Sequence, residues 1–215
     1  MIEALVIGTI AVGELALATI VPWWASWFLA WCGLSTGVAA VAYALRRPGL
    51  LMKERAGRYL LWPYLAFARV VATAAQRAGL VERQEIVPGL WVGGWPRRGA
   101  PGLAQLDLTA EMPRRGEAET YVCIPMLDGA APRPDTYQQA VAQALAWRRE
   151  GRAVLVHCAY GHGRSVAVVL GVLIAEGHAQ DVAEAHALVR KVRPAARMSP
   201  QQRAFLTKNL AQLRV

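Results

Sequence analysis

Apolar residues fill the first part of the chain almost without interruption. Between Ala4 and Leu45 the only charged residue is Glu14. A membrane-spanning helix needs about 20 mostly apolar residues, so this stretch is long enough for two of them. Pro22 lies near its middle, where a proline suits a turn, and the flanking tryptophans favour the membrane–water interface. We therefore expect residues 1–45 to form two transmembrane helices joined by a Trp-rich turn.

A cleaved signal peptide is the alternative interpretation of this stretch. Such a peptide begins with basic residues and has a single short apolar core. Here the chain begins Met-Ile-Glu-Ala-Leu, with an acid and no base, and the apolar run is longer than one such core. We expect a retained hairpin, in which Glu14 packs against the second helix or is protonated and has no chemical role.

Basic residues follow the apolar stretch directly. A single acid, Glu54, accompanies five cations there: Arg46, Arg47, Lys53, Arg55 and Arg58. Lys and Arg close to the ends of a span stay in the cytoplasm. This distribution predicts a multi-pass protein of a bacterial-type inner membrane. Both ends of the hairpin and the rest of the chain would then be cytoplasmic.

The next segment, residues 59–80, is apolar but interrupted by Arg69 and Arg77. We expect a helix here rather than a third span. Its aromatic residues suggest a helix lying at the membrane interface: Trp62, Tyr64 and Phe67. A helix packed on the following domain fits equally well, and both interpretations stay open. Residues 46–82 are accordingly expected to be a basic juxtamembrane segment.

From residue 83 to residue 215 the pattern changes to short apolar runs separated by turns. Strands are predicted at 89–94, 104–109, 120–125 and 153–158. Helices are predicted at 135–150, 164–176, 181–192 and 199–213. Two of these helices begin with apparent capping boxes, Asp135 with Gln138 and Ser199 with Gln202. This order predicts an α/β domain with a central sheet flanked by helices.

The composition and charge of the chain limit the kinds of molecule that it can bind. The 215 residues are enough for one domain with an addition, and 55% of them are hydrophobic. The net charge of +9 fits a protein held against anionic membrane lipid. Nucleic acid is the other partner that such charge permits, but no nucleic-acid motif is present, so we expect none. The cysteines, Cys32, Cys123 and Cys158, have neither metal-type spacing nor a disulfide pattern.

Candidate chemistry lies where the run Val154–His157 ends at Cys158. The loop that follows contains two glycines, which let a backbone turn sharply with its N–H groups inward. Arg164 then opens a helix, whose N-terminus adds positive potential. The loop therefore predicts a cup for a tetrahedral dianion, bound by Ala159, Tyr160, Gly161, His162, Gly163 and Arg164.

Within this cup the thiol and the guanidinium have complementary tasks. Arg164 can hold two oxygens with its bidentate fork. Cys158 lies at the floor in positive potential, where a thiolate nucleophile is favoured. We therefore expect Cys158 to attack phosphorus while Arg164 holds the oxygens. Tyr160 and His162 line the rim, and either of them touches the substrate or faces away.

The sequence His157-Cys158, five residues, Arg164-Ser165 resembles the Cys-dependent phosphatases of the protein tyrosine and dual-specificity superfamily. The likeness extends to residues 89–96, 106–111, 121–128 and 193–206, and covers roughly 85–213. Low-molecular-weight phosphatases carry the loop near the chain start, and a rhodanese would not need this combination. The resemblance implies a dual-specificity-phosphatase-like sheet flanked by helices, without metal or cofactor.

The resemblance also implies a mechanism. A general acid is expected about thirty residues before the Cys, where Asp128 stands; a plain turn residue is the alternative. Asp135 is the rival acid but is expected to be a helix cap. Asp128 would protonate the leaving oxygen and then activate water. Ser165 would stabilise the departing thiolate, and His157 would order the Cys by hydrogen bonds or merely pack beneath the loop.

Substrate class stays open between two hypotheses. One is a membrane-anchored protein phosphatase of the tyrosine or dual-specificity type. The other is a phospholipid phosphatase acting on a phosphatidylglycerophosphate- or phosphoinositide-type substrate, which the hairpin favours. Against inositides, Ala159 and His162 stand where the 3-phosphatase relatives place lysines. A third hypothesis, an inactive phosphate-binding module, conflicts with the complete set of Cys158, Arg164 and Asp128.

Overall fold

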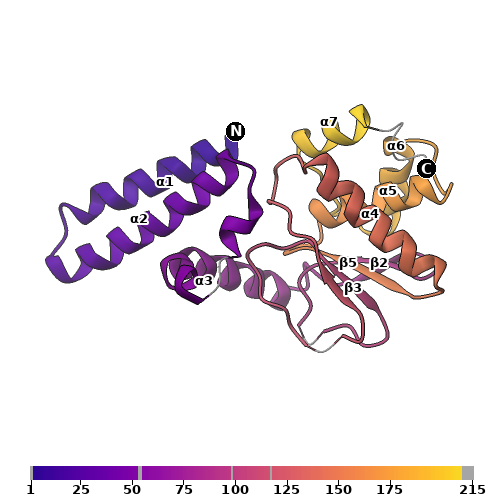
Figure 1. Ribbon diagram of the computed structural model, residues 1–215, viewed down its shortest axis with the longest axis horizontal. Helices are drawn as coiled ribbons and strands as arrows, with labels where there is room; N and C mark the ends of the chain where they lie inside the picture. Colours follow the sequence, from indigo (N-terminus) through magenta and orange to yellow (C-terminus); the bar gives the residue numbers. More distant parts are fainter. Residues whose placement is uncertain (1, 53–54, 98, 117, 210–215) are drawn as a thin grey trace. The chain divides into compact units, whose positions relative to one another are not determined.

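The computed structural model describes residues 2–52, 55–97, 99–116 and 118–209 (Figure 1). Lys53 and Glu54 of the basic segment, and residues 210–213 of the last predicted helix, lie outside the described residues. The chain divides into two compact units, which we treat separately: Met1–Val71 with Ala110–Met112, and Ala72–Thr109 with Pro113–Val215. The first unit begins with α1 (Ile2–Ala18), α2 (Trp23–Ala44) and the 3-10 helix η1 (Pro48–Leu51).

Helices α1 and α2 pack against each other with small residues inward. At Gly33 a Cβ atom would lie only 2.6 Å from Leu15 Cγ, so a glycine is needed for this close approach. The buried positions of the pair are small: Ala11, Ala18, Gly33, Ser35, Thr36, Ala39 and Ala42. The large apolar side chains point outward, and Trp23 and Trp27 are 78% and 77% exposed. The hairpin therefore has small side chains at its helix–helix contact and large apolar side chains on its outside.

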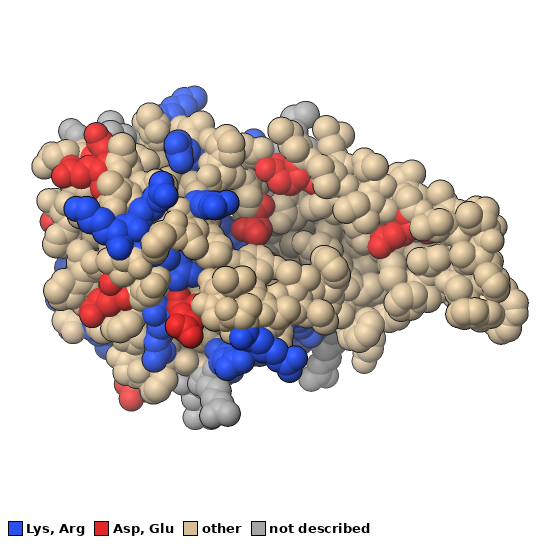
Figure 2. All heavy atoms as spheres, turned by 180° about the vertical axis from the view of Figure 1, so that it is seen from behind, with Lys and Arg blue, Asp and Glu red and all other residues tan. Residues whose placement is uncertain are grey.

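The predicted hairpin of two helices is present, but its two members differ in length. Within the described chain, only α2 is both long and apolar enough to cross a membrane. Helix α1 has 17 residues, at the lower limit for a span. Figure 2 shows a largely uncharged surface that is interrupted by acidic side chains, and side chains of Lys and Arg that gather in clusters.

Helix α3 (Arg55–Arg77) contains Pro63 in its interior. Proline lacks an N–H group and so leaves the carbonyl four residues earlier without its helical partner. That carbonyl, on Tyr59, accepts a hydrogen bond from the Trp31 indole N–H at 3.0 Å instead. The Trp31 and Trp62 rings stack with their centroids 5.7 Å apart. The predicted helix therefore exists, and its first part packs on α2.

The second unit contains a five-stranded sheet in the order β1-β2-β5-β3-β4. Its strands are β1 (Gln84–Val87), β2 (Leu90–Gly93), β3 (Ala104–Asp107), β4 (Tyr121–Cys123) and β5 (Val154–His157). Strand β1 pairs antiparallel with β2, and the remaining pairs are parallel. All four predicted strands are confirmed. The sequence did not predict β1, a half-buried edge strand with two polar residues among its four positions.

Four helices complete this unit: α4 (Pro134–Arg149), α5 (Arg164–Ala175), α6 (Val182–Val192) and α7 (Pro200–Lys208) (Figure 1). Helix α5 is central, because every residue from Arg164 to Ile174 is buried. One face of the sheet packs against these helices through alternate residues such as Val92, Val154 and Val156. Strand β5, which leads to Cys158, is thereby fixed between two neighbours and a buried helix.

Two caps were predicted, and one of them is wrong. Ser199 forms the expected capping box with Gln202. Helix α4 instead begins at Pro134, with Arg133 as its N-cap and no side-chain cap bond. Proline is favoured at the first helical position, where its fixed φ suits the helix. Asp135 therefore lies inside the first turn, where it accepts the Thr136 N–H at 2.8 Å.

Close contact between α4 and α5 generates a stability prediction. A Cβ on Gly171 would overlap the Tyr137 hydroxyl and lie 2.8 Å from Val141 Cγ2. We expect Gly171→Ala to lower the free energy of unfolding by about 1–3 kcal/mol, despite the higher helix propensity of alanine, when measured by denaturant titration in detergent.

Tyr137→Phe provides the control for this prediction. It removes the hydroxyl that donates to the Ala167 carbonyl at 2.9 Å, at a cost of about 1 kcal/mol. If the overlap is the cause, Gly171→Ala combined with Tyr137→Phe will cost less than the sum of the single changes. Strict additivity would contradict this explanation.

Candidate active site

The carboxyl end of β5 places Cys158 at the floor of a small cavity. This cavity has a volume of about 180 Å³ and is called the cup below. It is lined by Asp128, Gly129, Cys158, Tyr160, His162, Gly163, Arg197, Ser199 and Gln202. Cys158 itself is only 1% exposed. The structure thus brings together a thiol, a carboxylate and three of the six predicted loop residues, Tyr160, His162 and Gly163. The other three, Ala159, Gly161 and Arg164, are not among the residues that line the cup.

Four consecutive loop carbonyls accept hydrogen bonds from residues outside the loop. The Ala159 carbonyl accepts the Trp95 N–H at 3.1 Å, and the His162 carbonyl accepts the Arg197 N–H at 3.0 Å. Between them, the Arg193 side chain donates to the two remaining carbonyls, those of Tyr160 and Gly161. These four bonds fix the orientation of the peptide groups of the loop.

The N–H and C=O groups of a trans peptide point in opposite directions. The N–H groups of Tyr160, Gly161, His162 and Gly163 are therefore turned toward the inside of the loop. Consistent with this, the Gly161 N–H donates to Cys158 Sγ at 3.2 Å. Gly161 has φ 72° and a Cβ there would lie 2.6 Å from Gly94 N, so only glycine fits. Successive N–H groups of this kind form an anion-binding nest.

Two predicted residues lie directly beside the thiol. Ser165 Oγ is 3.4 Å from Cys158 Sγ, within hydrogen-bond reach of sulfur. His157 is buried, with its Nδ1 3.7 Å from Asp107 Oδ1. Burial lowers the pKa of His157, against the opposing effects of Asp107 and of the Cys158 backbone. His157 is therefore neutral at neutral pH.

Arg164 and Asp128 are brought together at the edge of the cup. Arg164 is buried, and its Nη1 donates to the Met126 carbonyl at 3.0 Å. Its Nε lies 3.3 Å from Asp128 Oδ1, and the Asp128 side chain is 44% exposed. Arg164 does not line the cup directly, but its partner Asp128 does. The carboxylate is thus held by a cation while it remains accessible.

Asp135, the rival carboxylate, lies elsewhere. It is exposed, pairs with Arg133 at 2.9 Å and does not line the cup. The Thr136 N–H and then Arg133 hold the pKa of Asp135 below its ordinary value. Because Asp135 does not line the cup, it has no place beside the leaving oxygen of a phosphate ester bound there.

The structure also places residues that the sequence prediction left open or missed. Tyr160 and His162 both line the cup. Burial, and then the nearby Arg193, lower the pKa of His162, so it is neutral at neutral pH. Six residues were not predicted to belong to the site: Trp95, Gly129, Arg193, Arg197, Ser199 and Gln202. Four of them lie in the segment 193–206, which was noted only for its resemblance to the family.

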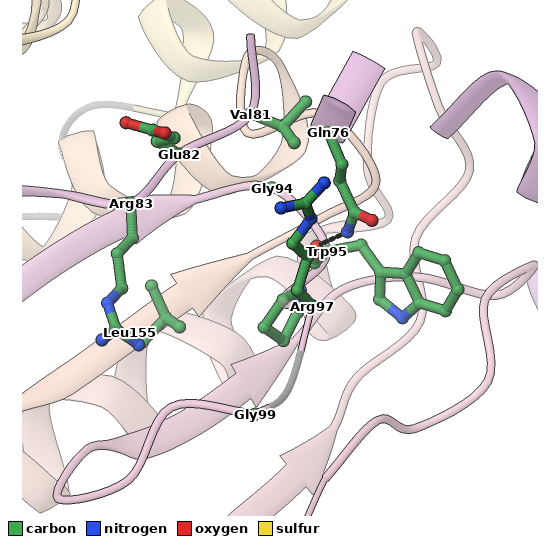
Figure 3. A pocket seen from close by; sticks show the side chains of 10 residues that line it. Gln76, Val81, Glu82, Arg83, Gly94, Trp95, Arg97, Gly99 and Leu155 are labelled. Atoms are coloured by element: carbon green, nitrogen blue, oxygen red, sulfur yellow. Dashed lines mark hydrogen bonds between the residues drawn. The ribbon is translucent and has the colours of Figure 1, made fainter. Parts of the chain in front are cut away.

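A larger cavity of about 970 Å³ lies next to the loop (Figure 3). Its floor includes Leu155, which points to the sheet face opposite the α-helical layer. Arg83 and Arg97 extend along its walls (Figure 3). The described residues that line this cavity include neither a cysteine nor a histidine. None of them places a nucleophile beside an anion-binding nest. The smaller cup, not this cavity, therefore has the composition of a reaction site.

Comparison with known proteins assigns the same part of the chain to a catalytic domain. Residues 90–209, more than half of the chain, match the family model "Dual specificity phosphatase, catalytic domain". Dual specificity protein phosphatase 12 of Mus musculus is 31% identical over 147 residues. That alignment covers 61% of this chain and 42% of the relative, so the chain spans less than half of that protein.

Two solved structures illustrate the likeness in fold. Human DUSP28 shows a TM-score of 0.55 and 24% identity, covering 61% of this chain and 95% of the other. PTPMT1, in a structure with PI(5)P, shows a TM-score of 0.52 and 19% identity, covering 61% and 96%. At these identities the likeness concerns the fold.

Proposed function

The chain belongs to the dual specificity phosphatase family through its catalytic domain, and we propose that it hydrolyses phosphomonoesters through a phosphocysteine at Cys158. The observation that carries this proposal is the position of Cys158 Sγ. It lies at the floor of the cup, receives the Gly161 N–H at 3.2 Å and is 3.4 Å from Ser165 Oγ. A thiolate in this place faces a nest that is complementary to phosphate oxygens.

In the first step the Cys158 thiolate attacks phosphorus, and the bond to the ester oxygen breaks. The inward N–H groups of the loop stabilise the charge on the equatorial oxygens. Arg164, which is buried beside the cup, adds its positive charge there. Asp128 gives its proton to the leaving oxygen, for which its exposed place on the rim of the cup is suited. The leaving alcohol carries that proton away.

In the second step water attacks the phosphocysteine. Asp128, now ionised, takes a proton from the water, and the S–P bond breaks to release phosphate and the thiolate. The Ser165 hydroxyl, 3.4 Å from the sulfur, donates to the departing thiolate. His157 is a neutral, buried packing residue next to the nucleophile in this account.

For the substrate we propose a phosphoprotein, of the tyrosine or dual-specificity type, with a phospholipid as the alternative. The exposed apolar surface of α2 favours the lipid, since it would hold the cup near head groups. The similarity in fold to PTPMT1, which was solved with PI(5)P, is compatible with this alternative. Phosphate release from a panel of phospholipids and phosphopeptides in detergent separates the two: turnover confined to lipids would exclude the phosphoprotein.

We propose that α1 and α2 anchor the enzyme in a bacterial-type inner membrane with the catalytic domain in the cytoplasm. The supporting observations are the outward large apolar side chains and the cations that follow α2, such as Arg46 and Arg47. Glu14 is partly buried in the hairpin, and we assign it no chemical role.

Cys158→Ser should abolish turnover of p-nitrophenyl phosphate, because a serine hydroxyl is a far weaker nucleophile here. Phosphate binding, measured by calorimetry, should survive, since the loop N–H groups are unchanged. A Cys158→Ser variant that retains near-wild-type turnover without added metal would disprove the mechanism. A wild-type protein that binds phosphate but turns nothing over would instead favour an inactive binding module.

Asp128→Asn should slow esters with poor leaving groups far more than activated ones. A positioned acid contributes about 10²–10⁴-fold, so an alkyl or tyrosyl phosphate should lose a few hundredfold, whereas an activated aryl phosphate should lose much less. The limb of the pH–rate profile that requires a protonated group should flatten. Asp135→Asn is the matched control and should do neither. Equal slowing of both ester types would mean that the wrong carboxylate has been assigned.

Reporter fusions at each end of the chain test the topology. If both α1 and α2 cross the membrane, N-terminal and C-terminal reporters will both be active in the cytoplasm. If only α2 crosses, the two reporters will lie on opposite sides. A C-terminal reporter that is active only outside the cytoplasm would overturn the proposed orientation.

A further inference from the structure

We propose that Arg193 is a positioning residue for the phosphate site, which orients two peptide groups of the catalytic loop and adds positive charge beside the cup. This inference rests on the proposed phosphatase function. Arg193 lies immediately after α6 and is only 4% exposed. It does not line the cup, so its action on a bound anion would pass through the loop.

The contacts of Arg193 with the loop are specific. Its Nε donates to the Gly161 carbonyl at 2.8 Å, and its Nη2 donates to the Tyr160 carbonyl at 3.1 Å. The second of these carbonyls belongs to the same peptide group whose N–H donates to Cys158 Sγ. The guanidinium therefore holds the outer end of a peptide whose inner end meets the nucleophile.

The other edge of the guanidinium is fixed to the segment that precedes β1 and to the first residue of that strand. Arg193 Nη1 donates to the Glu82 carbonyl at 2.6 Å and to Gln84 Oε1 at 3.0 Å. The planar fork of arginine serves these acceptors in several directions at once. A lysine ammonium, with its donors on one atom, cannot replace all four contacts.

The charge of Arg193 has no carboxylate to balance it. All four acceptors that it contacts are carbonyl or amide oxygens, and no ion pair to it is found among the described residues. A buried cation that contacts only neutral oxygens is costly to keep. The Cys158 thiolate offsets part of this cost, since it raises the pKa of Arg193 against the effect of burial. An anion in the cup would add counter-charge, and its binding would therefore stabilise the fold. Arg193 thus links phosphate affinity to loop geometry and to charge.

Two variants of Arg193 test the role in the full-length chain in detergent. We expect Arg193→Gln to weaken the binding of inorganic phosphate, measured by calorimetry, by about ten- to a hundredfold. KM for p-nitrophenyl phosphate should rise in parallel. Arg193→Lys keeps the charge and loses part of the fork, so its phosphate affinity should fall between those of the wild type and Arg193→Gln.

A third variant, Gln84→Glu, separates the effect of the positive charge of Arg193 from the effect of its hydrogen bonds. It keeps an oxygen acceptor for Arg193 Nη1 but places a carboxylate beside the guanidinium. We expect the melting temperature to be held or raised while phosphate binding weakens by about threefold or more. This variant also keeps the test decisive if Arg193→Gln fails to fold.

Arg148→Gln is the matched control. Arg148 also joins distant segments, through Glu176 at 2.5 Å and the Pro88 carbonyl at 3.1 Å, but contacts no loop residue. The substitution should lower the melting temperature and leave phosphate affinity unchanged.

The outcomes distinguish this inference from the proposed function. If the wild type binds phosphate and Arg193→Gln or Gln84→Glu binds it equally well, Arg193 is merely structural and the inference is overturned. If the wild type binds no phosphate at all, the phosphatase proposal fails, and the inference fails with it. Weakened binding in both variants, with unchanged binding in Arg148→Gln, would support the role.

Discussion

The catalytic loop depends on four carbonyl groups that turn away from its centre. Peptide groups that present their N–H ends to one point must direct their C=O ends to the opposite side, where each buried oxygen needs a donor. Trp95, Arg193 and Arg197 supply those donors. Without them the loop would either lose hydrogen bonds or rotate its peptides, and the nest beside Cys158 would disappear. The chemistry of the cup is therefore set by residues outside it as well as by the loop.

The fold brings these donors together at the carboxyl end of one strand. Strand β5 lies between β2 and β3, so its end emerges beside the loops that follow both neighbours. The loop after β2 delivers Trp95, and the connection after α6 delivers Arg193. Helix α5 starts at Arg164, so its N-terminal potential is directed at the same place. One buried strand thus organises the nucleophile, the anion nest and the guanidinium.

The sequence was informative wherever the signal was local. The strand before Cys158, the glycines of the loop and the helix opened by Arg164 lie within a dozen residues, and each was predicted. The Asp135 cap was wrong because Pro134 provides a competing helix start, which shifts the boundary by one residue. Arg193 could not be derived from pattern alone, because Glu82, which it contacts, lies 111 positions away. Strand β1 was not predicted for a related reason. It is a strand because it pairs with β2, and its composition alone does not indicate one.

The stretch between α3 and β1 is more than a linker that precedes the domain matched by the family. The Val81 carbonyl accepts the Gly94 N–H at 2.9 Å, and the next carbonyl, on Glu82, accepts from Arg193. At the end of α3, the Gln76 side chain donates to the Trp95 carbonyl, while the N–H of Trp95 holds the loop. The supporting groups on Gln76, Val81 and Glu82 all precede residue 90, where the family match begins. The scaffold of the cup in this chain therefore includes residues N-terminal to the matched domain, and a catalytic domain cut at residue 90 would lack one side of the support for its own loop.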